Sequence, residues 1–464
     1  MRLLFYFLGM LCCIGCEPDQ SKQAEATAQG LKPNFILDTT FIAASPQRNG
    51  DPVKGKQYLL SGKYMNSGLP TELFRNPITG SAMDSESEPT AGYSIIKASS
   101  NVEVVTANCL QCHAQKLNGV SVIGLGNSLA DFTLDPSAAI PQSDLFIKSK
   151  FGEQSPEYQA YNPFAKAIYA MGPQLITEVR GANPADKMAA ILAAHRDQET
   201  LEWRDEPKLP IPKEVIPTDV PAWWLLKKKN AMFYTTVGRG DFARLMMASS
   251  LLTMKDSTEA AEIDRHFADV QAYIYSLEPP QYPDPLDEAL IAEGAEVFEK
   301  RCSTCHGSYG DIPTYPNLLV GLKTIKTDSM LTLANFSNNR FVEWYNTSWF
   351  SKGRYGAQLV PEKGYLAPPL DGIWATAPYL HNGSVPTLAD LLDSKQRPKI
   401  WRRSFDDSDY DYEKVGWNYR ALKEKADKLT YDTSYPGYGN QGHNFGDRLT
   451  DNQRSSLIEY LKTL

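Results

Sequence analysis

The chain lacks any block of basic residues, and its formal net charge over 464 residues is −8. This mildly acidic balance argues against a nucleic-acid-binding protein. Glycine and proline occur at ordinary levels and aromatic residues make up 11% of the chain, which describes a globular protein with sizeable cores. The length suggests two to three domains on the usual size of a domain.

Cysteine and histidine are also scarce, with 7 and 6 residues, yet both concentrate in two short patterns. Residues 109–113 and 302–306 each read C-x-x-C-H. This pattern is the attachment signature of c-type haem. Two thiols at this spacing form thioethers to the vinyl groups of one haem, and the adjacent histidine binds the iron. We therefore expect two covalent haems c, one on Cys109, Cys112 and His113 and the other on Cys302, Cys305 and His306.

Two other uses of C-x-x-C pairs compete with haem attachment. Such pairs bind zinc, and two distant pairs could meet at one ion. They also form redox-active dithiols. Neither use requires a histidine directly after each pair, and the sequence has His113 and His306 in those places.

The N-terminus predicts export. An apolar run from Leu3 to Ile14 follows Met1-Arg2, and it is too brief to be a membrane span. Gly15 precedes Cys16, as in bacterial lipoprotein cleavage sites, although Cys13 stands where leucine is usual. A cleaved signal without a lipid is the alternative.

Lipidation of Cys16 would remove Cys12 and Cys13, and haem attachment would then use every other cysteine, so no disulfide is expected. The polar segment Glu17–Gly30 reads as a flexible tether. We expect the protein on the periplasmic face or the cell surface, held to a bacterial membrane by its lipid alone.

The pattern of helices predicts a mainly α fold of two fused cytochrome c-like domains, with long loops and few short strands. Each half opens with an Asp-Pro helix start, at Asp51 and at Asp284, and runs toward its haem motif. The halves end with apolar helical faces at Ser257–Leu277 and after the capping box at Thr450. The expected boundaries are 1–16 for the signal, 17–45 for the tether, 46–278 for the first domain and 284–464 for the second.

A third informative stretch runs from Gly364 to Leu388 and is too rich in proline and glycine for a helix. Its core, Pro378-Tyr379-Leu380-His381-Asn382-Gly383, resembles the bacterial dihaem cytochrome c peroxidase superfamily, and is most similar to the rubber-oxygenase-like branch. The resemblance also covers both haem motifs, the block from Trp223 to Arg244, and the rest of the chain after Gly364.

The resemblance implies the ligands of the second haem. The peroxidases place a methionine fourteen residues after the loop histidine, where this chain has Lys395. The rubber-oxygenase-like branch uses a second histidine near the C-terminus, and Gly439–Gly446 around His443 is similar to that feature. His306 and His443 are therefore the expected pair of ligands. The alternative is that His443 is a surface histidine in a glycine-rich loop.

Further residues have two possible roles each. The resemblance implies a calcium site at the carbonyls of Thr376 and Pro378, and calcium accepts such ligands. His381 either hydrogen-bonds near the haem edge, with a catalytic role, or holds its own loop. Trp223 and Trp224 either lie between the haems or fill a domain interface. The three lysines that follow, 227–229, either neutralise haem propionates or form a solvated helix face.

The sixth ligand of the first iron decides the chemistry. A haem with two protein ligands passes electrons, whereas a haem with an open face binds peroxide or dioxygen. No single side chain stands out as the second ligand, so an open or water-bound haem is expected at His113. The candidates are His195, His266, Met232, Met246 and Met247, with His266 expected to be packed on its helix and the last two in a core.

The expected function is that of a dihaem c-type cytochrome in electron transfer, with a haem-dependent, peroxidase-like oxidoreductase activity at the first haem and the second haem as relay. A dioxygenase cleaving an apolar polyene and a pure electron carrier remain alternatives. The expected partners are a small redox protein or quinone-linked donor or acceptor, with peroxide or dioxygen as substrate and no nucleic acid.

Overall fold

The computed structural model describes residues 38–74 and 92–464. The segment Asp38–Leu464 forms one compact unit. About 40% of the described residues are helical and about 14% lie in strands or isolated bridges, so the mainly α expectation is confirmed. The predicted signal, Cys16 and most of the predicted tether lie outside the described residues. Within those residues, no helix is both long and apolar enough to span a bilayer.

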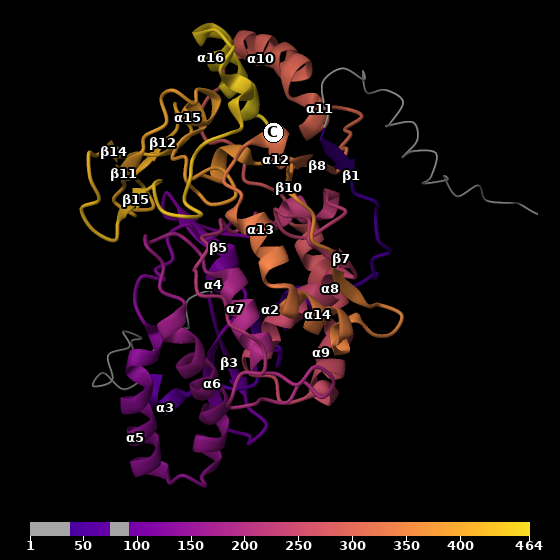
Figure 1. The fold of residues 1–464 in the computed structure, drawn as a ribbon, viewed down its shortest axis with the longest axis vertical. Helices are drawn as coiled ribbons and strands as arrows, with labels where there is room; N and C mark the ends of the chain where they lie inside the picture. Colours follow the sequence, from indigo (N-terminus) through magenta and orange to yellow (C-terminus); the bar gives the residue numbers. More distant parts are fainter. Residues whose placement is uncertain (1–37, 75–91) are drawn as a thin grey trace, which may run out of the picture. The chain divides into compact units, whose positions relative to one another are not determined.

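The helices are mostly short, although the longest of them, α9, α6 and α10, have 20, 16 and 14 residues (Figure 1). They are α2 Pro52–Ser61, α3 Thr71–Phe74, α4 Leu110–His113, α5 Ile140–Phe151, α6 Pro156–Met171, α7 Ala185–Ala194, α8 Phe242–Met246, α9 Ser257–Ser276, α10 Glu288–Arg301, α11 Ser303–His306, α12 Leu322–Ile325, α13 Met330–Ser337, α14 Asn339–Thr347, α15 Leu388–Leu392 and α16 Asp451–Leu461, with the 3-10 helix η4 at Trp223–Lys228.

Strands are more numerous than predicted, but each has at most five residues. They form antiparallel ladders of two or three strands, in the orders β2-β4-β3, β5-β6, β7-β9, β1-β8-β10, β12-β13 and β14-β11-β15. Their bounds are β1 Thr39–Phe41, β2 Leu69–Pro70, β3 Tyr93–Lys97, β4 Glu103–Ala107, β5 Ala114–Leu117, β6 Val120–Ile123, β7 Gly238–Gly240, β8 Leu318–Gly321, β9 Ala357–Leu359, β10 Gly364–Leu366, β11 Ile400–Arg402, β12 Tyr410–Asp411, β13 Gly416–Trp417, β14 Arg420–Ala421 and β15 Thr430–Asp432.

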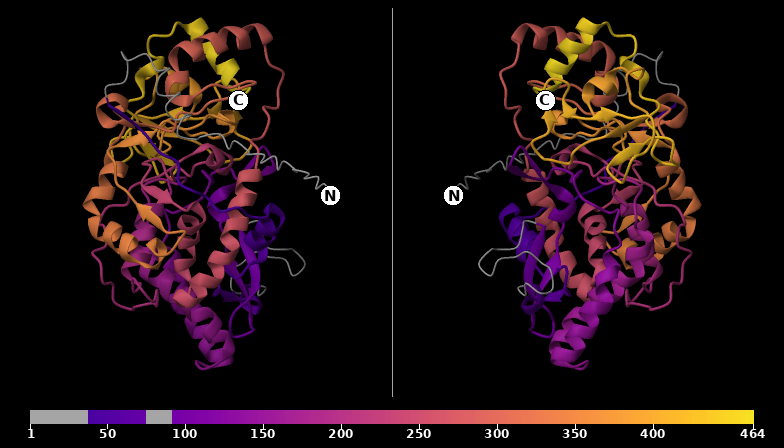
Figure 2. Two further views of the ribbon diagram at one scale, coloured as in Figure 1. Left: turned by 90° about the vertical axis from the view of Figure 1, so that its right-hand side faces the viewer. Right: turned by 90° about the vertical axis from the view of Figure 1, so that its left-hand side faces the viewer.

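Two helix pairs each pack closely at a glycine. Helix α2 packs on α9, and α10 packs on α16; the second pair lies side by side in all views (Figures 1 and 2). A Cβ on Gly55 would lie 1.9 Å from the carbonyl oxygen of Asp269, and one on Gly294 would lie 2.0 Å from that of Ser456. Only glycine permits so close an approach of two backbones. Each glycine is followed four residues later by a buried apolar side chain, Leu59 or Phe298.

The helix ends agree with the sequence in two of three cases. Asp51 caps α2 by accepting from the amides of residues 53 and 54, and Thr450 forms a capping box with Gln453 on α16; both predictions are confirmed. The predicted start at Asp284 is wrong. Asp287 caps α10 instead, because its carboxylate reaches two amides of the first turn.

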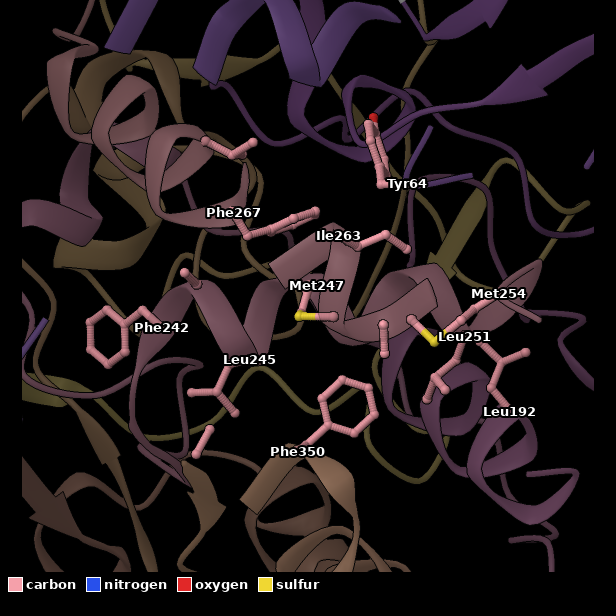
Figure 3. Packing of buried hydrophobic residues seen from close by; sticks show 14 of the residues in the cluster. Tyr64, Leu192, Phe242, Leu245, Met247, Leu251, Met254, Ile263, Phe267 and Phe350 are labelled. Carbon is pink, nitrogen blue, oxygen red and sulfur yellow. The ribbon is translucent and has the colours of Figure 1, made fainter. Parts of the chain in front are cut away.

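The largest apolar core draws on distant parts of the chain. It joins α2, α7, α8 and α9 to the segment from Trp344 to Leu359. Figure 3 shows Met247 inside it, among Leu245, Ile263 and Phe350. A second core contains Phe298 of α10, the 373–392 loop, and the apolar face of α16.

Candidate haem sites

The first C-x-x-C-H motif is fixed mainly by backbone hydrogen bonds. Helix α4 covers Leu110–His113, and the β5-β6 hairpin follows it directly. The hairpin returns the chain to the motif, where the amide of Gly124 donates to the carbonyl of His113 (2.8 Å) and the amide of Asn127 to that of Cys112 (2.8 Å). These bonds fix the backbone of Cys112 and His113.

Trp223 of η4 lies directly against His113. The two rings stack with centroids 4.4 Å apart and planes 19° apart. The amide of Trp223 donates to the carbonyl of Gly124 (2.8 Å), so the same glycine ties the histidine to the tryptophan. This contact places one of the predicted tryptophans at the first motif. Trp224 instead belongs to a separate cluster and donates from Nε1 to the carbonyl of Asp371 (2.8 Å).

The second motif begins where α10 ends. Cys302 caps the C-terminus of α10 and α11 covers Ser303–His306. Nδ1 of His306 lies 2.8 Å from the carbonyl oxygen of Pro368. A backbone acceptor at Nδ1 fixes the ring and leaves Nε2 as the ligating nitrogen, as in most metal-bound histidines. Pro368 lies in the loop singled out from the sequence.

His443 lies opposite His306, although 137 residues separate them in sequence. Their ring centroids are 6.2 Å apart. Two imidazoles bound to opposite sides of one metal, with N–metal bonds of about 2 Å, have centroids about 6 Å apart. The observed spacing therefore fits two ligands of a single iron. His443 also has φ +46°, a left-handed conformation that is uncommon outside glycine and is often found at functional sites.

Both His113 and His443 lie in surroundings that hold little water. Each is only partly buried by accessible surface, yet desolvation lowers the pKa of each imidazole to about 3. Both imidazoles are therefore neutral near pH 7, the form of histidine that binds a metal.

Arg397 holds the His443 loop and was not found from the sequence. It is 8% exposed. Its Nη1 donates to the carbonyls of Asn440 (2.8 Å) and Gly442 (2.6 Å), and Nη2 donates to that of His443 (3.2 Å). Backbone acceptors leave no signature in a sequence, so no residue pattern marks Arg397.

His381 is 5% exposed and stacks on Tyr365, with centroids 4.1 Å apart. Its carbonyl accepts from the amide of Asp219 (2.7 Å). Asn382 donates to the carbonyls of Gly437 and Gly439 (2.9 Å each). These two bonds tie the loop to residues 437–439, which lead to His443. Nε2 of His381 has no hydrogen-bond partner among the described residues, and burial lowers the pKa of this imidazole to about 3.

A carboxyl–phenol pair beside this loop was also missed. The hydroxyl of Tyr234 donates to Oδ2 of Asp219 (2.7 Å). Burial raises the pKa of Asp219 to about 7, although the bond from Tyr234 and the charge of Arg403 oppose that rise. Asp219 and Arg403 line a small cavity together with Pro378.

The predicted calcium site is not tested by the structure. Thr376 donates from its hydroxyl to the carbonyl of Ile373 (3.1 Å), and Pro378 lines the small cavity just described. Within residues 38–74 and 92–464, no group of three or more histidine, cysteine, aspartate and glutamate side chains comes together as a metal site. The two C-x-x-C pairs therefore do not meet at one zinc ion.

The pKa values of the thiols argue against the redox-active dithiol alternative. Burial raises the pKa of Cys109 and of Cys305 to about 11, and that of Cys302 to about 12. Reactive cysteines have lowered pKa values, because the thiolate is the nucleophile.

The other candidate ligands of the first iron stack on aromatic rings or pack at an apolar core. His195 is buried, stacks on Trp203 and lies 2.8 Å from the carbonyl of Arg204. His266 stacks on Tyr58, but its side chain is 43% exposed, so the prediction that it is packed holds only in part. Met246 and Met232 border the first core and Met247 is fully buried within it.

Comparison with known proteins supports the same cofactor. The family model described as RoxA-like, cytochrome c-like matches residues 364–402. Two proteins of Sinorhizobium fredii are similar, uncharacterized protein y4iJ with 30% identity over 253 residues and uncharacterized protein y4iM with 24% over 310. The alignments cover 40% and 58% of this chain, and 41% and 69% of those proteins. The family match indicates a c-type cytochrome that binds haem c.

Proposed function

We propose that the chain is a dihaem c-type cytochrome with an oxidoreductase activity at its first haem. Cys109 and Cys112 would hold one haem with His113 on its iron. Cys302 and Cys305 would hold the other, with His306 and His443 as its two ligands. Bound haem supplies one-electron chemistry, and an open iron face also supplies binding of peroxide or dioxygen.

The facing pair His306 and His443 is the observation that carries this proposal. Its 6.2 Å centroid spacing fits one iron. The carbonyl of Pro368 lies at Nδ1 of the His306 ring, and Arg397 holds the backbone carbonyl of His443. A haem with both sides taken has no place for a substrate, so the second haem would act as an electron relay.

Two haem units also explain the repeated helix pairs. In each half, a helix that begins before the motif packs through a glycine on the last helix of that half. Two fused cytochrome c-like domains would produce this arrangement. Trp223 against His113 and Trp224 bonded to the Asp371 loop would then form a short route for electrons from one haem unit to the other.

The first haem is the proposed reaction site, because the side chains that could be its second ligand pack against other residues instead. Peroxide is the favoured substrate, with electrons from a small redox protein or a quinone-linked donor. Cleavage of an apolar polyene by dioxygen is the second candidate, supported by the RoxA-like match. A lipid on Cys16 would hold the protein at the outer side of a bacterial membrane.

Spectroscopy of the exported protein tests the proposal. A pyridine haemochrome assay should give two covalent haems per chain, retained in acidified acetone. The oxidised protein should show one low-spin and one high-spin haem, with carbon monoxide binding to only one haem after reduction. Two low-spin haems would instead establish a pure carrier, and one haem or none would overturn the proposal. Turnover with peroxide and a donor then separates peroxidase from oxygenase.

A further inference from the structure

The ring of Phe445 is exposed and contacts the proposed ligand of the second iron. Phe445 is 46% exposed. Its ring lies perpendicular to the imidazole of His443, with centroids 5.2 Å apart and planes 89° apart. His443 in turn faces His306 at 6.2 Å. A single aromatic side chain therefore connects the molecular surface to the proposed ligand pair of the second haem.

The short turn that carries Phe445 is fixed by the rest of the fold. Phe445 lies in the 3-10 helix η8, Asn444–Gly446. Gly446 packs so closely on the backbone of Leu392 that a Cβ would not fit there. An exposed ring on a fixed backbone has little conformational freedom left to lose when a partner covers it.

Helix α12 lies along one side of the turn. The amide of His443 donates to the carbonyl of Ile325 (2.8 Å), and a Cβ on Gly442 would lie 2.5 Å from the carbonyl oxygen of Lys326. Lys326 is exposed, as is Lys323 three residues earlier. Among the residues that the structure describes, neither ammonium has an ion-pair partner. Two positive charges therefore remain available beside the turn.

The other side of the turn also carries cations without partners. The carboxylate of Asp447, two residues after Phe445, accepts from the amide (2.9 Å) and the hydroxyl (2.7 Å) of Ser394. The residues that directly follow these two, Arg448 and Lys395, are exposed, and in the described part of the chain neither forms an ion pair. The Phe445 surface is the exposed ring together with the four cations around it, Lys323, Lys326, Lys395 and Arg448.

Carboxylates on the neighbouring segments are engaged within the fold. Asp328 accepts from the amides of Met330 (2.9 Å) and Gly439 (3.2 Å), and Asp393 lies 3.6 Å from Arg454. The charges left without a partner on the segments around the turn are therefore positive. This balance is the reverse of that of the whole chain, whose formal net charge is −8.

We propose that the Phe445 surface is the docking site of an acidic redox protein that donates electrons to the second haem. The proposal rests on the proposed dihaem function and adds the place and the charge of the electron donor. Opposite charges steer such a partner to the surface. A quinone instead needs a mostly apolar pocket, which an exposed ring among cations does not offer. One electron leaves the partner, which is oxidised, and reduces ferric iron to ferrous through Phe445 and His443, with no bond made or broken.

Reduction kinetics of the purified, oxidised protein test the proposal, with an acidic flavodoxin in its hydroquinone form as the probe. Stopped-flow absorbance follows the reduction of the low-spin haem. The bimolecular rate constant should fall at least tenfold as the ionic strength rises from about 0.01 M to about 0.5 M, because salt screens opposite charges. The net charge of the whole chain predicts the opposite trend. A rate constant that stays constant or rises with salt overturns the inference.

Two double variants locate the effect on the surface. Lys326→Glu with Lys395→Glu reverses two charges of the Phe445 surface and should lower the rate constant at low salt at least tenfold. Lys56→Glu with Lys97→Glu makes the same change in net charge at exposed positions of α2 and β3 and should change the rate constant less than threefold. Equal effects in the two double variants overturn the inference, because net charge alone would then explain them.

Phe445→Ala tests the ring itself. At about 0.5 M ionic strength, where steering is screened, this variant should be reduced at least fivefold more slowly, with its low-spin spectrum retained. Tyr169→Ala removes an aromatic side chain that is 62% exposed on α6 and should stay within twofold of the unaltered protein. Phe445→Leu, which keeps an apolar side chain, replaces Phe445→Ala if the low-spin spectrum changes. An unchanged rate constant overturns the inference.

The outcomes separate this inference from the function beneath it. A protein without covalent haem overturns both, and the haemochrome assay gives that result before any kinetic measurement. A protein with two covalent haems whose reduction by the flavodoxin is insensitive to salt and to the charge reversals overturns the inference and leaves the dihaem cytochrome intact.

Discussion

Arg397 donates a hydrogen bond of 3.2 Å to the carbonyl oxygen of His443, and it also holds the two neighbouring turns of that loop. The left-handed conformation of His443 would be unfavourable without such support. Under the proposed function, Arg397 would be a positioning residue that acts on the second haem only through the histidine.

Replacing Arg397 by methionine should lower the free energy of unfolding by about 3 kcal/mol or more, because several buried carbonyls lose a charged donor. Thermal unfolding measures this loss. Part of the second haem should also become high-spin. Arg402→Met, which removes a partly exposed ion pair with Asp427, should cost less than about 1 kcal/mol. Equal losses in both variants would refute a special role for Arg397.

His443→Ala should convert one of the two haems from low-spin to high-spin while both remain covalently attached, since attachment depends on the cysteines alone. The spectrum of the oxidised protein measures the change. The matched control is His266→Ala, which removes a histidine whose side chain is 43% exposed and should leave the spectrum as it was. A low-spin second haem in His443→Ala would mean that another residue is the ligand.

Gly294→Ala should destabilise the protein by about 1–3 kcal/mol, because a Cβ there would overlap the carbonyl of Ser456 on α16 and force the helices apart. Gly55→Ala should have a similar effect at the α2–α9 contact. Chemical denaturation measures both. Glu299→Ala on an exposed position of α10 is the control, with a change within about 0.5 kcal/mol. Tolerance of both alanines would contradict the tight helix crossings.

The carboxyl of Asp219 should make stability fall as the pH rises. Its folded pKa is raised to about 7, above the value of about 3.9 expected in the unfolded chain. Between these values the folded state binds more protons, so the free energy of unfolding decreases from pH 4 to pH 7. The decrease from this group is at most about 4 kcal/mol. Asp219→Asn should remove that slope, and an unchanged slope in the variant would assign it to other groups.

The sequence was sufficient for features that depend on local chemistry. The C-x-x-C-H motifs, the cap at Asp51 and the capping box at Thr450 each involve residues a few positions apart, so their spacing alone carries the information. The predicted start of α10 was wrong because local spacing could not decide between two candidates. Asp284-Pro285 and Asp287 are both acceptable starts by local rules, and the longer-range contact of Asp287 with Glu459 is not visible locally.

Long-range features needed the structure or a resemblance. Residue spacing could not pair His306 with His443, and it was the family resemblance that proposed them. Arg397 and Pro368 act on backbone atoms, which every residue possesses, so sequence patterns do not mark them. Lys229 was one of three equivalent lysines until its burial, at 8% exposure, distinguished it. The many two- and three-residue strands also escaped, since such short ladders have no periodicity to detect.

The shared core has a consequence for dissecting the chain. Trp344 and Phe350 are buried against helices that precede the proline-rich stretch near residue 280, and β9 pairs with β7 across the same divide. A fragment that ends at that stretch would therefore expose a large apolar surface and the unpaired edge of β7. Separate expression of the front half should give aggregates, and co-expression with the missing half should rescue it.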